Sequence, residues 1–477
     1  MSRVPGHQKG RSLVWQKMDL SHFQFGEIVE ISSRCRWSGP QLLNWVEQRA
    51  HEWMALQPPS RGAALIYTSN SAVFFVDLLA CWRLGFCAIP MDATAPARVR
   101  QEWEQQLAPA LIVEPNGTVR KRTAEPSLWP EEFALGLLSS GSSGPPRLTL
   151  HTCESLQRKM ETLAKVIPLN QIQNTLCALP VHFGHGLVCN SLFPWLMGST
   201  LHLQEGFTPA FVAALDEMIE AYRISFFSST PVVWGLLEQF GTRLPKPGLR
   251  RIHCASAPLD ERRAETMRAW SGPAELWNVY GLTEFLGWVS GSRFERIEDC
   301  TRVGAGWDTE ISIDPANSEV RLKAPFMMRA SRALNALDVE EELRTHQETE
   351  FWRTGDAGRW NGGNLVLTGR IDFQINKAGL KIQPEEIEMT AQQAAGVADV
   401  ACTGFEDPIW GSKVGLLVCV RNGQTVHPET LRAWLAERLP AYKVPDLIRV
   451  VERLPRTSRG KLERHSLRDL ANREFRK

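Results

Sequence analysis

The sequence lacks the features that carry a chain into or across a membrane. Its start, MSRVPGHQKGRSLVWQ, contains no apolar core of signal-peptide length. Its most apolar run, AALIYTSNSAVFFVDLLACW, is interrupted by Ser69, Asn70, Ser71 and Asp77, so it does not form an uninterrupted span. We therefore expect a cytoplasmic protein without a transmembrane segment.

Patterns for metal binding and for disulfide bonding are also missing. The ten cysteines include no CxxC pair, and the eleven histidines include no HExxH. Scattered cysteines argue against a zinc ribbon or a disulfide framework and favour reduced thiols. We expect neither a structural nor a catalytic zinc.

An excess of charge of one sign is absent as well. The chain has 54 lysines and arginines against 53 aspartates and glutamates, a formal net charge of +1. No global field would draw such a chain to nucleic acid or to an anionic membrane. The basic end, residues 456–477, is a local exception that a solvated helix face also explains.

The remaining composition is typical of a folded multidomain protein. Of 477 residues, 43% are hydrophobic and 22% are charged. This length exceeds what a single hydrophobic core usually organises, so we expect at least two domains.

Strands and helices alternate through most of the chain. Residues 38–57 have apolar side chains at helical spacing, residues 63–68 form an apolar strand pattern, and a second helical pattern stops at Gly85. Such alternation predicts a parallel sheet with helices on both faces. After about residue 300 the pattern becomes that of antiparallel strands.

Beyond residue 372 a separate alternation of helix, strand, strand, helix and strand predicts a small domain of about 100 residues. The predicted fold class is therefore α/β. A large N-terminal domain of stacked α/β sheets with a β-rich part spans 1–370, and a small C-terminal α+β domain spans 371–477.

The segment LLSSGSSGPPRLTLHT, residues 137–152, allows two interpretations. Six consecutive serines and glycines are typical of a flexible linker, but their amides and hydroxyls could also surround a phosphate. The segment interrupts an α/β pattern, which weakens the linker interpretation. No Gly-Lys-Ser/Thr follows, which excludes a Walker loop, and the loop ends in Pro145, Pro146 and the cation Arg147.

SSGSSGPPR resembles the TSGTTGxPK loop of the adenylate-forming superfamily of acyl-CoA synthetases, aryl-CoA ligases, peptide-synthetase adenylation domains and luciferases. Further segments are similar to other motifs of this family and follow in the same order: CASAPL (254–259), NVYGLTE (278–284), WRTGD (352–356), GRIDFQINKAGLKIQPEEIE (369–388) and LPRTSRGKLER (454–464). The resemblance covers residues 38–470.

This resemblance implies that the chain binds ATP and Mg²⁺ and activates a carboxylic acid as an acyl-adenylate. The loop serines and Arg147 would hold phosphates, Tyr280 would stack on adenine, Asn278 would lie near its amine, and Asp356 would accept both ribose hydroxyls. The implied nucleotide site comprises Ser139, Ser140, Gly141, Ser142, Ser143, Gly144, Arg147, Ser256, Ala257, Pro258, Asn278, Tyr280, Gly281, Asp356, Arg370 and Lys381.

The resemblance also implies the catalytic residues. Thr283 would contact the α-phosphate, and Glu284 would ligate Mg²⁺ through carboxylate oxygen. Lys461 would reach the oxygens between the carboxylate and the α-phosphate. The small domain would be mobile, with Asp372 as its hinge, and Gly379 would belong to the loop that opens a path for a thiol.

The acyl side departs from peptide-synthetase domains. Those domains carry an aspartate after the phenylalanine of residues 178–195, whereas Phe183 is followed here by Gly184, so an α-amino acid is disfavoured. We predict that His182, Phe183 and Ser228 line the acyl pocket, although a structural role is equally open for the histidine.

Residues 379–388 resemble those of acyl- and aryl-CoA ligases, and no carrier module follows before Lys477. We therefore expect an acid ligase with coenzyme A as acceptor. The phosphopantetheine of a separate acyl carrier protein is the alternative. Arg147 and Asn376 stand where many relatives have lysine, so a non-catalytic nucleotide-binding protein is the third possibility. The identity of the acid stays open.

Overall fold

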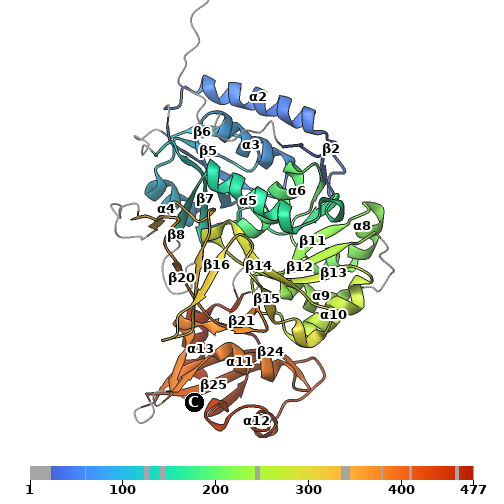
Figure 1. Cartoon of the computed structure of the whole chain (residues 1–477), viewed down its shortest axis with the longest axis vertical. Coiled ribbons are helices and arrows are strands. Elements are labelled where there is room, and N and C mark those ends of the chain that lie inside the picture. Colours follow the sequence, from blue (N-terminus) through green and yellow to red (C-terminus); the bar gives the residue numbers. More distant parts are fainter. Residues whose placement is uncertain are drawn as a thin grey trace, which may run out of the picture.

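The computed structural model describes residues 23–59, 61–122, 129–139, 147–241, 248–334, 344–377, 380–407, 411–456 and 461–475. Two eight-stranded sheets form the body of the large domain, and the small domain lies below them, in orange and red in Figure 1.

Sheet I has the strand order β14-β13-β12-β11-β9-β10-β1-β2, and its core strands run parallel. Its members are β1 (Ile28–Glu30), β2 (Arg36–Trp37), β9 (Asn174–Cys177), β10 (Thr200–Leu203), β11 (Phe226–Ser229), β12 (Arg251–Cys254), β13 (Glu275–Leu282) and β14 (Gly287–Arg293).

Sheet II has the order β19-β18-β8-β7-β4-β3-β5-β6. Its members are β3 (Ala63–Thr68), β4 (Cys87–Asp92), β5 (Leu111–Val113), β6 (Val119–Lys121), β7 (Phe133–Ser139), β8 (Arg147–Thr152), β18 (Ala330–Ala333) and β19 (Arg344–Thr345). Strand β18 pairs antiparallel with β8, so the chain returns to this sheet after completing sheet I.

The helices of the large domain are α2 (Gly39–Ala55), α3 (Ala72–Arg83), α4 (Ala97–Leu107), α5 (Cys153–Val166), α6 (Phe193–Leu196), α7 (Pro209–Ala213), α8 (Leu215–Ala221), α9 (Pro231–Phe240) and α10 (Glu261–Ser271). A π-helix, η3, spans His185–Leu192. Short 3₁₀ turns lie at Leu169–Gln171, Thr283–Phe285 and Ile297–Asp299.

The first elements confirm the predicted alternation. Helix α2 starts at the N-cap Ser38, whose side chain and backbone form a capping box with Gln41. Helix α3 ends before Gly85, whose φ of +79° suits a residue without Cβ.

The main core lies between the two large sheets. It joins apolar side chains of α5, such as Leu156 and Met160, to Phe226 and Trp288 of sheet I and to Leu135 of sheet II. Each of these side chains is fully or almost fully buried. The helices between the sheets therefore fix how sheet I faces sheet II.

Sheet III is antiparallel, as predicted for the region after residue 300. Its order is β15-β21-β20-β17-β16, with β15 (Arg302–Gly304), β16 (Glu310–Ile313), β17 (Glu319–Lys323), β20 (Trp352–Asn361) and β21 (Asn364–Arg370).

The small domain follows a 3₁₀ turn at Ile371–Phe373 and has its own cores. It contains β22 (Ile375–Lys377), β23 (Leu380–Ile382), α11 (Pro384–Gln392), β24 (Val397–Asp407), β25 (Gly411–Val420), α12 (Pro428–Ala436), a 3₁₀ turn at Ala441–Lys443, β26 (Leu447–Val450) and α13 (Arg464–Phe475). The predicted fold class, a large α/β domain with a smaller C-terminal domain, is confirmed; the boundary at residue 370 stays a prediction.

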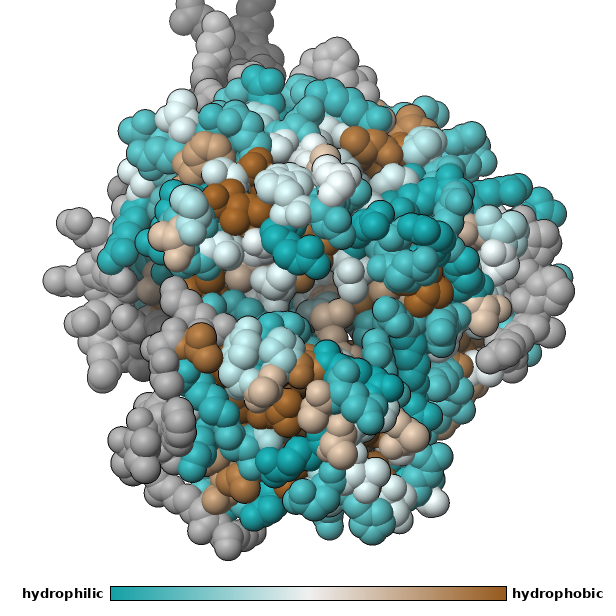
Figure 2. Space-filling model, turned by 60° about the horizontal axis from the view of Figure 1, so that its bottom comes forward, coloured by the Kyte–Doolittle hydropathy of each residue, from teal (hydrophilic) through white to brown (hydrophobic). Residues whose placement is uncertain are grey.

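Among the described helices, none combines the length and apolar character needed to cross a membrane. Apolar surface is dispersed on the face shown in Figure 2, where brown patches alternate with hydrophilic side chains.

Helix α5 carries a fully buried lysine. Lys159 donates to the carbonyl of Trp288, and its ammonium lies 4.2 Å from the ring centroid of Phe326. No carboxylate of the described residues forms an ion pair with it. Burial lowers the pKa of Lys159 to about 8. The charged form is therefore disfavoured by folding.

We predict that Lys159→Met raises the free energy of unfolding at pH 7 by about 1–3 kcal/mol, because it removes a desolvated charge. The folded protein binds this proton less tightly than the unfolded chain, so the penalty is complete below about pH 8 and shrinks from pH 8 towards the ordinary lysine pKa of 10.5. Denaturant unfolding at pH 7, 8.5 and 10 measures the difference in the free energy of unfolding between Lys159→Met and the wild type, which should decrease as the pH rises.

The control is Lys165→Met on the same helix, where an exposed lysine pairs with Asp308. It should change stability by less than about 1 kcal/mol. A Lys159→Met protein that is less stable than the wild type at every pH would contradict the prediction.

Candidate active site

The Ser/Gly segment connects two neighbouring strands of one sheet. Strands β7 and β8 are antiparallel, Ser139 pairs with Arg147 in the register, and Ser139 Oγ donates to the Arg147 carbonyl at 3.2 Å. Because β7 and β8 are paired in one sheet, the segment joins two strands of sheet II and is not a linker between domains. Ser140, Gly141, Ser142, Ser143 and Gly144 lie outside the described residues.

The end of this hairpin meets the turn after β13. Burial raises the pKa of the Glu284 carboxyl, and the nearby positive charges of Arg147 and Arg370 oppose that shift. The neighbouring Thr283 is held by its carbonyl, which lies 3.1 Å from His151 Nε2. Burial lowers the pKa of His151 to about 3, so the ring is neutral and Nε2–H donates this bond.

The predicted ribose acceptor has two partners. Tyr280 donates its hydroxyl hydrogen bond to Asp356, and Arg370 Nη1 donates to the other carboxylate oxygen at 2.9 Å. Arg370 also contacts Asp372 at 2.9 Å, which ties the predicted hinge to the end of β21. Negative charge from Asp356 further raises the pKa of Glu284, so the two carboxylates are close enough to interact.

The predicted adenine segment follows β12. Ser256 adopts φ +75°, a left-handed conformation that is strained for a residue with Cβ, and it precedes Ala257 and Pro258. Asn278 donates to the carbonyl of Cys300 at 2.7 Å. Gly281 lies at an irregularity of the β13–β14 pairing, where a Cβ would come 2.2 Å from the Gly287 carbonyl oxygen. The close approach requires glycine.

The predicted acyl residues begin with two aromatic rings that lie close together and are tilted by 56°. The rings of His182 and Phe183 have centroids 4.0 Å apart, and His182 Nε2 lies 4.0 Å from Asp92 at the end of β4. Ser228 is fully buried in β11.

His185, the first residue of the π-helix, connects the acyl and nucleotide segments. Its Nε2 lies 2.6 Å from Ser228 Oγ, and its Nδ1 lies 2.9 Å from Ser256 Oγ. Burial and, as a smaller cause, the charge of Lys461 together lower its pKa to about 3. A π-helix is rare and often marks a functional site. The sequence singled out Ser228 and Ser256, and the structure joins them through this histidine.

Lys461 comes from the small domain, and its charge acts on His185 of the large domain. Three residues later, Arg464 binds Glu388 at 2.7 Å and Glu385 at 3.1 Å, both on α11. These ion pairs anchor the segment that follows the lysine. Gly379 and the side chain of Lys381 lie outside the described residues.

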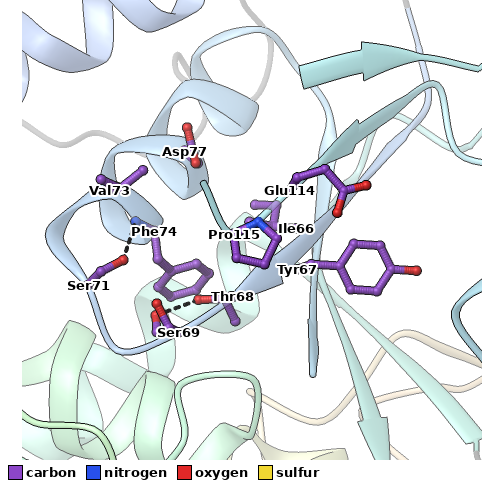
Figure 3. A pocket seen from close by; sticks show the side chains of 10 residues that line it. All are labelled: Ile66, Tyr67, Thr68, Ser69, Ser71, Val73, Phe74, Asp77, Glu114 and Pro115. Carbon is purple, nitrogen blue, oxygen red and sulfur yellow. Dashed lines mark hydrogen bonds between the residues drawn. The ribbon is translucent and has the colours of Figure 1, made fainter. Parts of the chain in front are cut away.

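A separate small recess, shown in Figure 3, lies where β3 meets α3 and β5. Its lining includes Tyr67, Phe74, Asp77 and Glu114 and contains none of the motif residues. Asp77 there is paired with Arg49 at 2.6 Å, so its charge is already compensated.

Sequence reasoning missed two functional candidates in β12, Arg251 and His253, which are 1% and 0% exposed. Their apolar strand pattern indicated only a core position. Neither residue belongs to a recognised motif, so no signal in the sequence distinguished them.

Comparisons with known proteins identify the family of the chain. Residues 100–324 match the sequence model of the AMP-binding enzyme family, and residues 386–461 match that of the AMP-binding enzyme C-terminal domain. Triostin synthetase I from Streptomyces triostinicus is 28% identical over 364 residues, which are 72% of this chain and 66% of that protein.

A salicylyl-CoA synthase / salicylate adenylyltransferase from a Streptomyces species is 29% identical over 361 residues, 71% of this chain and 63% of that protein. The matches thus span just under two thirds of these two relatives. The fold resembles that of o-succinylbenzoate CoA synthetase from Bacillus subtilis, solved with an acyl-adenylate, with a TM-score of 0.80, 20% identity and coverage of 96% of this chain and 97% of that one. With both family models matched in order, the chain belongs to the adenylate-forming superfamily of AMP-binding enzymes.

Proposed function

We propose that this protein uses ATP to convert a carboxylic acid into an acyl-adenylate, releasing pyrophosphate, and then transfers the acyl group to the thiol of coenzyme A. The carboxylate oxygen forms a bond to the α-phosphorus as the bond to pyrophosphate breaks. The thiol sulfur then attacks the acyl carbon, and AMP leaves.

The observation that carries this proposal is that the charge of Lys461, a residue of the small domain, acts on His185 of the large domain. A lysine of the small domain acts on a histidine that bonds both the acyl-side Ser228 and the adenine-side Ser256. A cation at this junction is suited to the charge that develops between carboxylate and α-phosphate. This arrangement corresponds to an adenylation state in which the small domain faces the site.

Other residues would bind the phosphates and the ribose of ATP. Arg147 and the loop serines would bind the outer phosphates, and Thr283 would contact the α-phosphate. Asp356, positioned by Tyr280 and Arg370, would bind the ribose hydroxyls.

Glu284 fits a magnesium ligand, because its burial disfavours an isolated negative charge and a bound cation would stabilise the ionised carboxylate. Magnesium at Glu284 would neutralise phosphate charge during the displacement.

Coenzyme A is the favoured acceptor, because one relative is a salicylyl-CoA synthase. A carrier-protein phosphopantetheine is the alternative. A non-catalytic nucleotide-binding protein is the competing class. Acid-dependent exchange of labelled pyrophosphate into ATP tests the enzyme proposal directly. ATP binding without exchange for any acid of a broad panel would overturn it.

We predict that Lys461→Ala lowers acid-dependent pyrophosphate exchange by about 10²–10³-fold, because one electrostatic contact to the transition state is lost. Thiolysis of a supplied acyl-adenylate should be spared, since Lys461 acts in the first half-reaction only. Lys121→Ala, which changes a lysine of the distant edge strand β6, is the control. Normal exchange in Lys461→Ala would refute the assignment.

We predict that Asp356→Ala raises the KM for ATP by about 10–100-fold, because hydrogen bonds to a charged acceptor are lost. Asp356→Asn should be less affected, since an amide oxygen still accepts from Tyr280. The control Asp308→Ala removes a surface carboxylate that pairs with Lys165. Initial rates at varied ATP measure the effect, and an unchanged KM in Asp356→Ala would exclude the nucleotide role.

We predict that free coenzyme A accepts the acyl group with a higher kcat/KM than a purified holo-carrier protein. The same activated acid is offered to both thiols, and thioester formation is measured. A carrier preference would replace coenzyme A with the alternative acceptor while leaving the adenylation proposal intact.

A further inference from the structure

A polar cluster lies in the face of sheet I that packs towards the π-helix. Ser228 of β11 stands opposite His253 of β12 in the parallel register, and Trp288 of β14 packs on His253 with ring centroids 4.5 Å apart. The cluster is inside the protein, since these three side chains are at most 1% exposed. It sits among apolar core residues, where a hydrogen-bonding side chain needs a specific reason.

Arg251 fixes the proton position of His253. Its Nε donates to His253 Nε2 at 2.7 Å, and a guanidinium has only donors, so Nε2 must be the accepting nitrogen. Burial, with the charge of Arg251, holds the pKa of His253 well below its usual range, so the ring is neutral. The single ring proton is therefore on Nδ1, which makes Nδ1 a donor.

Two donors of this cluster have no acceptor among the described residues. They are His253 Nδ1–H and the indole Nε1–H of Trp288. A buried N–H group without an acceptor is destabilising, and two such groups in contacting side chains call for a common partner.

The donors lie directly behind the acyl-side residues. The ring centroid of Trp288 is 5.4 Å from that of His185, and His185 Nε2 contacts the Ser228 hydroxyl. The same histidine is the large-domain group on which the charge of Lys461 acts.

We propose, building on the adenylating function above, that His253 and Trp288 form the distal end of the acyl site and that the acid carries a second oxygen acceptor, a hydroxyl, carbonyl or carboxylate oxygen, for His253 Nδ1 and Trp288 Nε1. Arg251 is a positioning residue that keeps the proton on Nδ1. An acid without this oxygen leaves both donors unpaired, and sites built for hydrogen bonding reject such analogues strongly, by up to about 10⁴-fold.

The test compares acids in pairs of matched size by pyrophosphate exchange. In each pair, one acid has no oxygen besides the carboxylate that is activated, and the other acid carries an additional oxygen acceptor. Examples are benzoate with 2-hydroxybenzoate, and pentanoate with 4-oxopentanoate or butanedioate. We expect the best substrate to carry the second oxygen, with a kcat/KM at least about 10-fold above its partner. The hydroxyl, carbonyl and carboxylate arms identify the oxygen type.

Variants of His253 test whether the polar cluster causes the preference between the two acids of a pair. His253→Leu removes the donor, and His253→Asn keeps an amide donor near the position of Nδ1. His253→Leu should collapse the ratio of kcat/KM within the preferred pair, and His253→Asn should retain part of it. The control His202→Leu changes a buried histidine of β10 in the same sheet and should leave the ratio unchanged.

The inference would be overturned if acids without the additional oxygen acceptor supported the fastest exchange. It would also be overturned if the ratio of kcat/KM within the preferred pair were unchanged in His253→Leu. Either result leaves the adenylating function standing, because exchange is still observed. Absence of exchange with every acid would instead reject the proposed function itself.

Discussion

The ion pairs of Arg464 with Glu385 and Glu388 hold the segment after Lys461 against α11. The same arginine donates to the Cys402 carbonyl at 2.9 Å, so helix, strand and lysine segment share one anchor. Buried ion pairs add little net stability, but removing one partner is costly, so such a cluster is better suited to fixing a position. The position of Lys461, three residues before Arg464, therefore depends on this anchor.

In the large domain, charged residues of the predicted nucleotide site come from all three sheets. Glu284 follows β13 of sheet I, Arg147 starts β8 of sheet II, and Asp356 belongs to β20 of sheet III. Arg147 and Asp356 both act electrostatically on Glu284. Because each of these three residues belongs to or directly follows a paired strand, the packing of the sheets places their charges near one another.

Much of this organisation could be predicted from the sequence, because local patterns decide it. The capped helix after Ser38, the buried strand at 63–68 and the helix ending at Gly85 follow from side-chain periodicity. Strand β18 could not be assigned to sheet II, because its partner β8 lies almost two hundred residues earlier and no local pattern encodes that pairing. The π-helix that places His185 between Ser228 and Ser256 is a tertiary effect, which no local pattern encodes.

The neutrality of His185 has a chemical consequence for the junction that it occupies. Burial and the neighbouring Lys461 both lower its pKa, so the lysine alone carries positive charge there. Only interactions that strengthen in the transition state accelerate a reaction. A second cation at this place that bound the ground-state carboxylate equally tightly would therefore not increase the rate. A neutral imidazole can still orient Ser228 and Ser256. The histidine thus provides geometry beside Ser228 and Ser256, and the charge that acts on it comes from Lys461 of the small domain.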